Sequence, residues 1–175
     1  AITGSGGKTT VKGMLFSVLE TAFNEKVFAT HGNLNNHIGV PFSLLSLTSE
    51  HEYAVIEMGA SAVGEIDYLT HMAKPHVALV NNVMAAHVEG FGSIDNIAIA
   101  KGEIYEGLSE QGIAIINVEE HYAPQWVLQN EHRSTLTYSV NPAQHPQADI
   151  QAHNIQQNNT GCVCFQLHIN GVQVS

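Results

Sequence analysis

The first ten residues contain a glycine-rich turn that ends in Lys-Thr, a composition suited to holding phosphate groups. The stretch reads AITGSGGKTT, with Gly4, Gly6 and Gly7 before Lys8 and Thr9. In the standard phosphate-binding loop, four residues separate the first glycine from Gly-Lys-Thr. That spacing would put the first glycine at position 2, which is isoleucine. The stretch is therefore either a variant phosphate loop or a helix-opening turn without a ligand.

Polar residues also stand at the ends of two later apolar segments. Residues 53–58 (YAVIEM) carry Glu57 near their end, and residues 76–82 (HVALVNN) end in Asn82, with His87 five positions further on. In an open parallel sheet, ligands bind beyond the carboxyl ends of the strands. We therefore expect these side chains to share one edge of a sheet with the glycine-rich turn.

This set of groups is typical of a nucleotide-and-magnesium site. Backbone amides and the dipole at a helix N-terminus hold phosphate oxygens. Lys8 would reach the β- and γ-phosphates, and the Thr9 hydroxyl and the Glu57 carboxylate are oxygen ligands that suit Mg²⁺. Taken alone, Glu57 could also be a solvated carboxylate at a strand end.

The polarity pattern predicts an α/β fold with a mostly parallel sheet flanked by helices. Apolar residues at helical spacing, among them Val11, Met14, Leu15, Val18 and Leu19, predict an amphipathic helix through Phe23. Further helices are expected from Pro41 to 47, at 64–72 and at 93–108, and strands at 27–29, 53–58, 76–82 and 112–117. Strands that alternate with helices indicate βαβ crossovers.

The C-terminal part has a different pattern. Residues 149–156 and 162–169 alternate in polarity, and Asn170-Gly171 is a strong hairpin signal. The alternation places Val163, Phe165, Leu167 and Ile169 on one face of a strand. We expect a main α/β part over about residues 1–140 and a small antiparallel β part over about residues 141–175.

Lys101 breaks the apolar face of the 93–108 helix. That face carries Ile94, Ile97, Ala98, Ile104, Tyr105 and Leu108, and Lys101 falls on it seven residues after Ile94. A charged group in a buried stripe costs several kcal/mol unless it is paired, neutralised or modified. The lysine could snorkel to the surface, or it could point into the active site with its charge altered.

Composition excludes several classes of protein. The net charge is −10 with only six Lys and Arg residues, which argues against a nucleic-acid partner. No apolar run approaches the ~20 residues of a membrane span, and the first residues form a turn rather than a signal peptide. Cys162 and Cys164 are two residues apart, a poor geometry for a mutual disulfide. We expect a cytoplasmic protein without membrane insertion, and a chain cut from a longer protein.

At this point the motifs resemble a known family, the Mur ligases of bacterial peptidoglycan synthesis, relatives of folylpolyglutamate synthase. TGSGGKTT looks like that family's shortened phosphate loop, although Gly6 stands where a small polar residue would be expected. The segments GNLNNHIGVP, VIEMGA, NNVMAAHVEGFGS and AKGEIY are similar to the MurF type. The resemblance runs along the whole chain and covers the central ATPase domain, which implies that N-terminal UDP-binding and C-terminal domains are absent.

The resemblance implies ATP and Mg²⁺ as cofactors. The residues implied for ATP are Gly4, Ser5, Gly6, Gly7, Lys8, Thr9 and Thr10, with Asn82 near the phosphates and Asn117 near the adenine. The implied magnesium ligands are Thr9, Glu57, His87 and Lys101 as a carbamate, and the implied catalytic residues are Lys8, His87 and Lys101. A carbamate would turn the buried cation into an anion.

The implied reaction is ATP-dependent addition of D-alanyl-D-alanine to UDP-N-acetylmuramoyl-tripeptide through an acyl phosphate, by a monomer. Asn33 and Asn36 match the loop that contacts the UDP-sugar-peptide, although asparagines in such a loop can simply form Asx turns. We expect little ligase turnover from this part alone. The alternatives are another Mur ligase or a folylpolyglutamate-synthase-like ligase, a P-loop nucleotide-binding switch without ligation, and an α/β domain with a purely structural turn.

Overall fold

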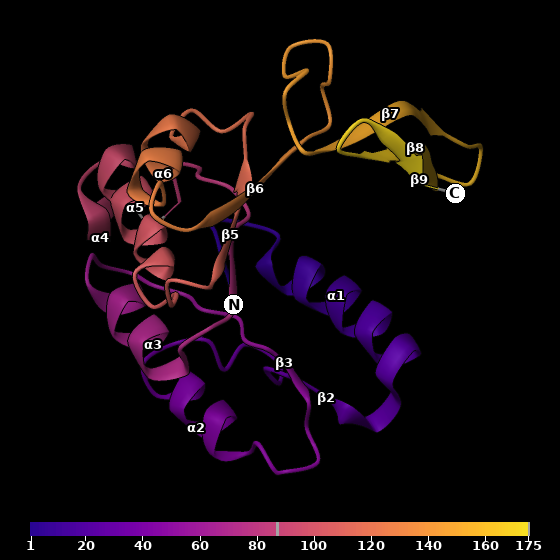
Figure 1. Cartoon of the computed structure of the whole chain (residues 1–175). Helices are drawn as coiled ribbons and strands as arrows, with labels where there is room; N and C mark the ends of the chain where they lie inside the picture. The colour runs from indigo at the N-terminus through magenta and orange to yellow at the C-terminus, as the bar shows by residue number, and fades with distance from the viewer. Residues whose placement is uncertain (87, 175) are drawn as a thin grey trace.

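The computed structural model describes residues 1–86 and 88–174 as an α/β structure (Figure 1). Its strands are β1 (Ile2–Thr3), β2 (Val27–Ala29), β3 (Tyr53–Val55), β4 (Val77–Val80), β5 (Ile113–Asn117), β6 (Ser134–Ser139), β7 (Ile150–Gln157), β8 (Val163–Ile169) and β9 (Val172–Val174). Its α-helices are α1 (Lys8–Phe23), α2 (Gly39–Leu45), α3 (Glu65–Ala73), α4 (Val88–Phe91), α5 (Ile94–Gly102) and α6 (Ala123–Gln129). Within the described residues, no helix has both the length and the apolar content needed to cross a membrane.

The main sheet has the order β1-β4-β5-β6-β7-β8-β9, and β2 and β3 form a smaller parallel pair. Strands β1 to β7 of the main sheet run parallel, whereas β8 and β9 are antiparallel to their neighbours. A single bridge between Ile2 and Glu57 joins the two sheets. The carboxyl ends of β1 and β4 and the residues that follow β3 therefore lie next to one another.

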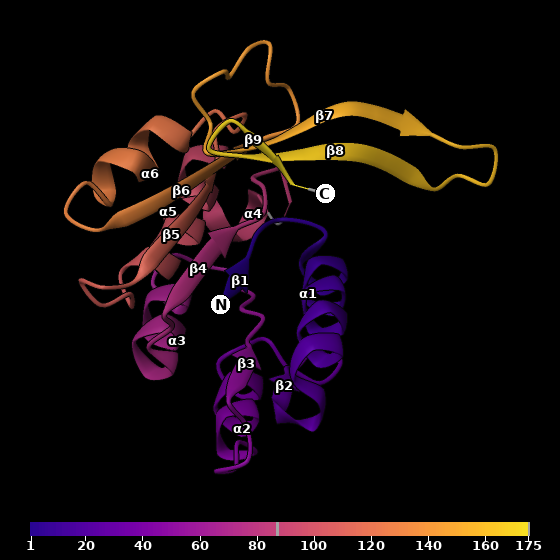
Figure 2. The same cartoon turned by 45° about the vertical axis from the view of Figure 1, so that its right-hand side comes forward.

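The sheet separates the helices into two groups. Figure 1 shows α2 to α6 on one side of the strands and α1 on the other, and Figure 2 shows the same separation from a second angle. The core lies under α3, α5 and α6 and contains Met58, Ile66, Tyr105, Ile116 and Trp126, each at most 1% exposed. The mostly parallel α/β fold predicted from the sequence is confirmed.

The expected 93–108 helix differs from the observed one in two ways. The Ser93 hydroxyl caps its N-terminus by accepting a hydrogen bond from the Asn96 amide at 3.1 Å. However, the α-helix ends at Gly102 and continues as a 3-10 turn over Glu103–Tyr105. The prediction that Ile94 is buried was wrong, because it lies in the first turn and is 43% exposed.

The apolar face predicted for the first helix was also wrong. Met14 and Val18 are each 66% exposed, and the single buried residue of α1 among the described residues is Lys12. The physical reason is that α1 contacts β1, β2 and β3 on one side, whereas no helix in the described part of the chain covers its other side (Figure 1).

The antiparallel C-terminal part is confirmed. Strands β7 and β8 form a long ribbon, and Asn170 and Gly171 turn the chain into β9 (Figure 2). Pairing of Tyr138 with Ile150 continues the main sheet into this ribbon. Cys162 and Cys164 are exposed free thiols.

Candidate nucleotide-and-metal site

The glycine-rich turn connects β1 to α1 and is shaped by the end of β4. Gly7 adopts a left-handed conformation (φ 71°) immediately before the first helical residue, Lys8. The Gly6 amide donates to Asn82 Oδ1 at 2.9 Å, and Asn81 Nδ2 donates back to the Gly6 carbonyl at 2.8 Å. Asn82 therefore fixes the turn, and the amides at the start of α1 form the type of cradle that binds phosphate.

Two of the glycines in the turn are close to the end of β4 and the residues after it, Gly4 to the backbone and Gly6 to a side chain. Gly4 has φ 150°, and a Cβ there would lie 3.0 Å from Asn81 Cβ and 3.1 Å from the Asn82 backbone nitrogen. A Cβ at Gly6 would lie 2.5 Å from Met84 Cε, the end of a flexible side chain. Gly6 therefore leaves room for Met84, where the family resemblance suggested a small polar residue.

Gly4→Ala is expected to destabilise the protein, because it adds backbone strain of about 1–3 kcal/mol and a steric conflict with β4. Gly13→Ala is the matched control, since Gly13 lies within α1 and a Cβ there meets nothing within 4 Å. The control is expected to stabilise by about 0.5–1 kcal/mol. Urea unfolding of both variants measures the difference, and equal effects of the two substitutions would contradict the strained geometry.

Glu57 is the buried carboxylate of the site. It is 1% exposed, and its Oε1 accepts hydrogen bonds from the Thr9 hydroxyl at 3.2 Å and Asn35 Nδ2 at 2.8 Å. Its Oε2 lies 3.2 Å from Lys12 Nζ. The alternative of a solvated strand-end carboxylate was wrong, because the residues after β3 turn inward against α1.

The Thr9 hydroxyl and the Glu57 carboxylate fit a magnesium ion. Mg²⁺ is usually held in proteins by one or two carboxylates together with phosphate and water oxygens. Thr9 and Glu57 supply a hydroxyl and a carboxylate next to the phosphate cradle, and Glu57 Oε2 is buried without a well-aligned hydrogen-bond donor. No group of three or more His, Cys, Asp and Glu residues that could hold a metal occurs in the part of the chain that the structure describes. His87, predicted at this edge, lies outside the described residues.

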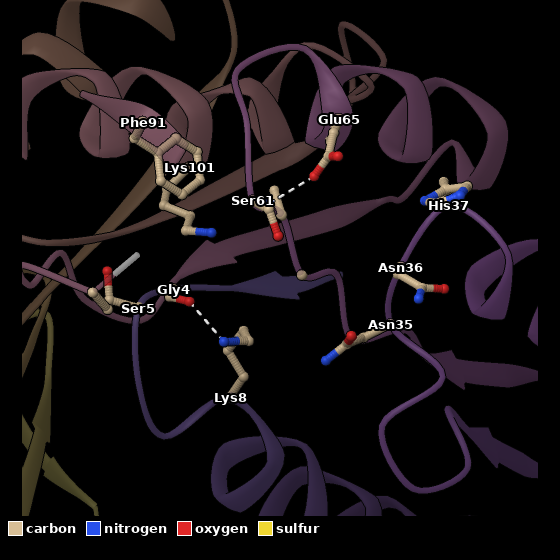
Figure 3. Close-up of a pocket in the computed structure, with 13 residues that line it drawn as sticks. Gly4, Ser5, Lys8, Asn35, Asn36, His37, Ser61, Glu65, Phe91 and Lys101 are labelled. Atoms are coloured by element: carbon tan, nitrogen blue, oxygen red, sulfur yellow. Dashed lines mark hydrogen bonds between the residues drawn. The ribbon is translucent and has the colours of Figure 1, made fainter. Parts of the chain in front are cut away.

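A cavity of about 360 Å³ opens above the cradle (Figure 3). It is lined by Gly4, Ser5, Lys8, Asn35, Asn36, His37, Gly59, Ala60, Ser61, Glu65, Ala86, Phe91 and Lys101. Lys8 reaches in from the first turn of α1, and its Nζ donates to the Gly4 carbonyl at 2.8 Å. Among the described residues, Lys8 forms no salt bridge. Its positive charge is therefore directed at the place where an anionic ligand would bind.

Lys101 lies on the opposite wall of the cavity. It is 3% exposed, and its Nζ lies 5.3 Å from the centre of the Phe91 ring. Figure 3 shows its side-chain nitrogen directed toward the cavity. The snorkelling alternative was therefore wrong. Burial lowers the pKa of the Lys101 ammonium from 10.5 to about 8, with a further contribution from the charge of Lys8.

This pKa shift predicts a pH dependence of stability. Below about pH 8 both the folded and the unfolded chain carry the Lys101 proton, so the cost of burying the charge is fully present. Between pH 8 and 10.5 only the unfolded chain holds the proton, and stability rises with pH. Relative to Lys101→Met, the wild type is expected to gain about 2 kcal/mol between about pH 7.5 and about pH 9.5. Urea unfolding in CO₂-depleted buffer measures this, and parallel pH profiles of the two proteins would contradict it.

The remaining predicted residues are distributed around this site. Asn36 lines the cavity, and its Oδ1 accepts from the Ile38 and Gly39 amides at the start of α2, so it combines an Asx-type turn with a position at the site. Asn33 and Thr10 are exposed and are not among the cavity-lining residues. Asn117 ends β5, where its Oδ1 accepts from the Glu119 amide, also away from this lining.

Two residues that contact Glu57, Asn35 and Lys12, were not predicted from the sequence. Asn35 belongs to the same asparagine-rich loop as Asn33 and Asn36, but only the fold shows which of the three points at the carboxylate. Lys12 lies one helical turn after Lys8, a spacing that puts both lysines on one side of α1. That spacing was the available signal for Lys12.

Comparison with known protein families gives a match over nearly the entire chain. The family described as "Mur ligase middle domain" matches residues 2–175. Among curated relatives, a UDP-N-acetylmuramoyl-tripeptide–D-alanyl-D-alanine ligase of Escherichia coli is 47% identical over 161 residues, 92% of this chain and 34% of the relative. The ligase of the same name in Haemophilus influenzae is 52% identical over 128 residues, 72% of this chain and 28% of the relative.

Solved structures of MurF ligases also match this chain. A crystal structure of MurF from Acinetobacter baumannii superposes with a TM-score of 0.89 at 37% identity, covering 99% of this chain and 36% of that one. MurF ligase from Thermotoga maritima in complex with ADP superposes with a TM-score of 0.79 at 30% identity, covering 99% of this chain and 38% of that one. The chain thus spans about a third of the length of the relatives that it matches.

Proposed function

This chain belongs to the Mur ligase family, as a middle domain, and from that premise we propose that it is the ATP-binding part of an enzyme that joins D-alanyl-D-alanine to UDP-N-acetylmuramoyl-tripeptide. The observation that carries the proposal is that Gly4, Ser5 and Lys8 of the phosphate cradle line one cavity, while the next residue, Thr9, donates its hydroxyl hydrogen bond to the Glu57 carboxylate. The ADP bound in the related Thermotoga structure supports a nucleotide as the ligand.

In the proposed reaction, the terminal carboxylate of the tripeptide attacks the γ-phosphorus of ATP and ADP leaves. The amine of D-alanyl-D-alanine then attacks the carbonyl carbon of the acyl phosphate, and phosphate leaves as the amide bond forms and the amine loses a proton. Two anions must approach each other in the first step. The amides at the start of α1 and Lys8 hold and neutralise the phosphates, and Thr9 and Glu57 would hold Mg²⁺, which supplies further charge stabilisation.

We assign Lys101 the role of a carbamylated residue. Its pKa of about 8 leaves part of the side chain as the neutral amine near neutral pH. The neutral amine attacks CO₂, a nitrogen–carbon bond forms and one proton leaves, which gives an anion. Burial without a carboxylate partner among the described residues disfavours the ammonium form, whereas the carbamate would lie across the cavity from Lys8 and help hold the metal.

The loop between β2 and α2 would contact the UDP-linked substrate. Asn36 lines the cavity beside His37, and Asn33 lies three residues earlier in the same loop. We assign His87 to a second metal position from the family resemblance, and Asn117 to the adenine side. The enzyme would act as a monomer in the cytoplasm, where ATP is available, and this chain without further domains would show little turnover.

Phosphate release by the complete protein tests the proposal. We expect release from ATP to require both UDP-N-acetylmuramoyl-tripeptide and D-alanyl-D-alanine, with the ligated pentapeptide product formed in equal amount. Release that needs neither substrate would indicate a nucleotide-hydrolysing switch and would overturn the proposal. A requirement for a different amino substrate would indicate another ligase of the family.

A further inference from the structure

Lys12 is a buried cation that the proposed reaction does not use. It is 6% exposed, although α1 buries no other residue in the described part of the chain. Its Nζ donates to the carbonyls of Thr30 and Gly32, each at 2.8 Å, and lies 3.2 Å from Glu57 Oε2. An ammonium group has three N–H donors. Two of the three therefore bond to backbone carbonyls, and the charge of the group is paired with the Glu57 carboxylate rather than directed at a phosphate.

The two carbonyls that Lys12 binds belong to the start of the substrate loop. Thr30 directly follows β2, and Gly32 is the third residue of the loop that continues to Asn36. The same loop reaches Glu57 by two further contacts, because the Glu57 amide donates to Thr30 Oγ1 at 3.0 Å and Asn35 Nδ2 donates to Glu57 Oε1 at 2.8 Å. Lys12 thus connects the start of the loop to Glu57 Oε2, and Asn35 connects the later part of the loop to Glu57 Oε1.

The burial of this pair distinguishes it from an ordinary surface ion pair. Lys26 and Glu52 also form a salt bridge, but their side chains are 55% and 53% exposed, compared with 8% and 1% for Lys12 and Glu57. A buried carboxylate without a counter-charge is strongly unfavourable. Since Lys12 already supplies that counter-charge, a free divalent cation gains little from Glu57 and is repelled by Lys12.

We propose that Lys12 is a positioning residue that neutralises Glu57 and makes the divalent cation depend on the phosphates of the nucleotide for binding. This inference rests on the proposed magnesium site. A cation that arrives with ATP brings compensating negative charge into the cradle, whereas the cation alone does not. Lys12 also holds Glu57 Oε2, so that Oε1 faces the Thr9 hydroxyl.

Calorimetric titration of the complete protein with MgCl₂, with and without ATP, tests this role. Lys12→Met removes the charge and keeps much of the side-chain length, and it is expected to bind free Mg²⁺ about tenfold more tightly than wild type, the effect of one nearby unit charge. Lys12→Arg keeps the charge and is expected to bind free Mg²⁺ as weakly as wild type. Lys26→Met is the matched control from the exposed pair and is expected to change nothing.

The outcomes separate this inference from the proposed function. If wild type binds Mg²⁺ with ATP in a Glu57-dependent way but Lys12→Met binds free Mg²⁺ no more tightly, the role of Lys12 is wrong and the site stands. If wild type shows no Glu57-dependent Mg²⁺ binding even with ATP, the magnesium site itself is wrong.

A second variant covers the case that Lys12→Met does not fold. The double variant Lys12→Met/Glu57→Gln leaves neither charge of this pair unpaired. It is expected to fold and to show no Mg²⁺ binding in the calorimetric titration. If the double variant also fails to fold, the protein needs Lys12 for its hydrogen bonds to the Thr30 and Gly32 carbonyls rather than for pairing with Glu57. Its role toward Glu57 is then overturned.

Discussion

Lys8→Met in the complete protein is expected to lower the rate of ATP-dependent phosphate release by about 10²–10³-fold, the usual cost of removing one group that stabilises charge in the transition state. Lys8 is the cation of the cradle, its Nζ bonds only to the Gly4 carbonyl among the described residues, and it faces the cavity. Methionine keeps the length of the side chain, so the first turn of α1 should stay intact. Steady-state phosphate release measures the rate.

The control for this prediction is Lys26→Met. The Lys26 ammonium pairs with Glu52 at the surface. Lys26 follows the C-terminal end of α1, whereas the cradle lies at the N-terminal end of this helix. We expect an unchanged rate for the control. A loss of less than about threefold for Lys8→Met, with unchanged unfolding temperature, would show that Lys8 does not act on the transferred phosphate.

Glu57→Gln is expected to abolish most Mg²⁺-dependent activity, with a loss of at least about 100-fold, because a metal ion contributes several kcal/mol of charge stabilisation to phosphoryl transfer. Glutamine preserves the shape of the side chain but is a poorer ligand for Mg²⁺. The Mg²⁺ concentration needed for half-maximal phosphate release should rise at the same time. A titration of the rate with MgCl₂ measures both quantities.

Stability must be compared in parallel, since Glu57→Gln also leaves Lys12 without its carboxylate. Glu52→Gln is the matched control, because it removes the carboxylate of the exposed Lys26–Glu52 pair, which is screened by solvent and is expected to contribute little to stability. An unchanged Mg²⁺ requirement in a folded Glu57→Gln protein would place the metal elsewhere.

Much of this site could be predicted from the sequence because its parts follow regular patterns. Apolar runs located the strands, and the rule that ligands bind beyond the carboxyl ends of parallel strands placed Glu57 and Asn82 beside the glycine-rich turn. Helical periodicity placed Lys101 on a buried face, and the structure has it 3% exposed and lining the cavity. Each of these inferences needs only local spacing.

Other parts depend on tertiary packing that local spacing does not contain. Strand β6 (STLTYS) and helix α6 were not predicted, because four of the six residues of β6 are Ser or Thr and the large apolar residues of α6 are adjacent rather than at helical spacing. The contacts of Asn35 and Lys12 with Glu57 arise from segments up to 45 residues apart in sequence. The exposed side of α1 could not be predicted either, because periodicity shows which residues share a face but not whether anything covers it.

The most direct test of the account is a crystal structure of the complete protein with a non-hydrolysable ATP analogue and Mg²⁺. We predict the β- and γ-phosphates on the amides of residues 4–9 beside Lys8, a magnesium ion bound by Thr9 and Glu57, and additional density on Nζ of Lys101. Phosphates bound outside this cradle, or a metal without contact to Glu57, would contradict the assignment of this cavity as the ATP and magnesium site.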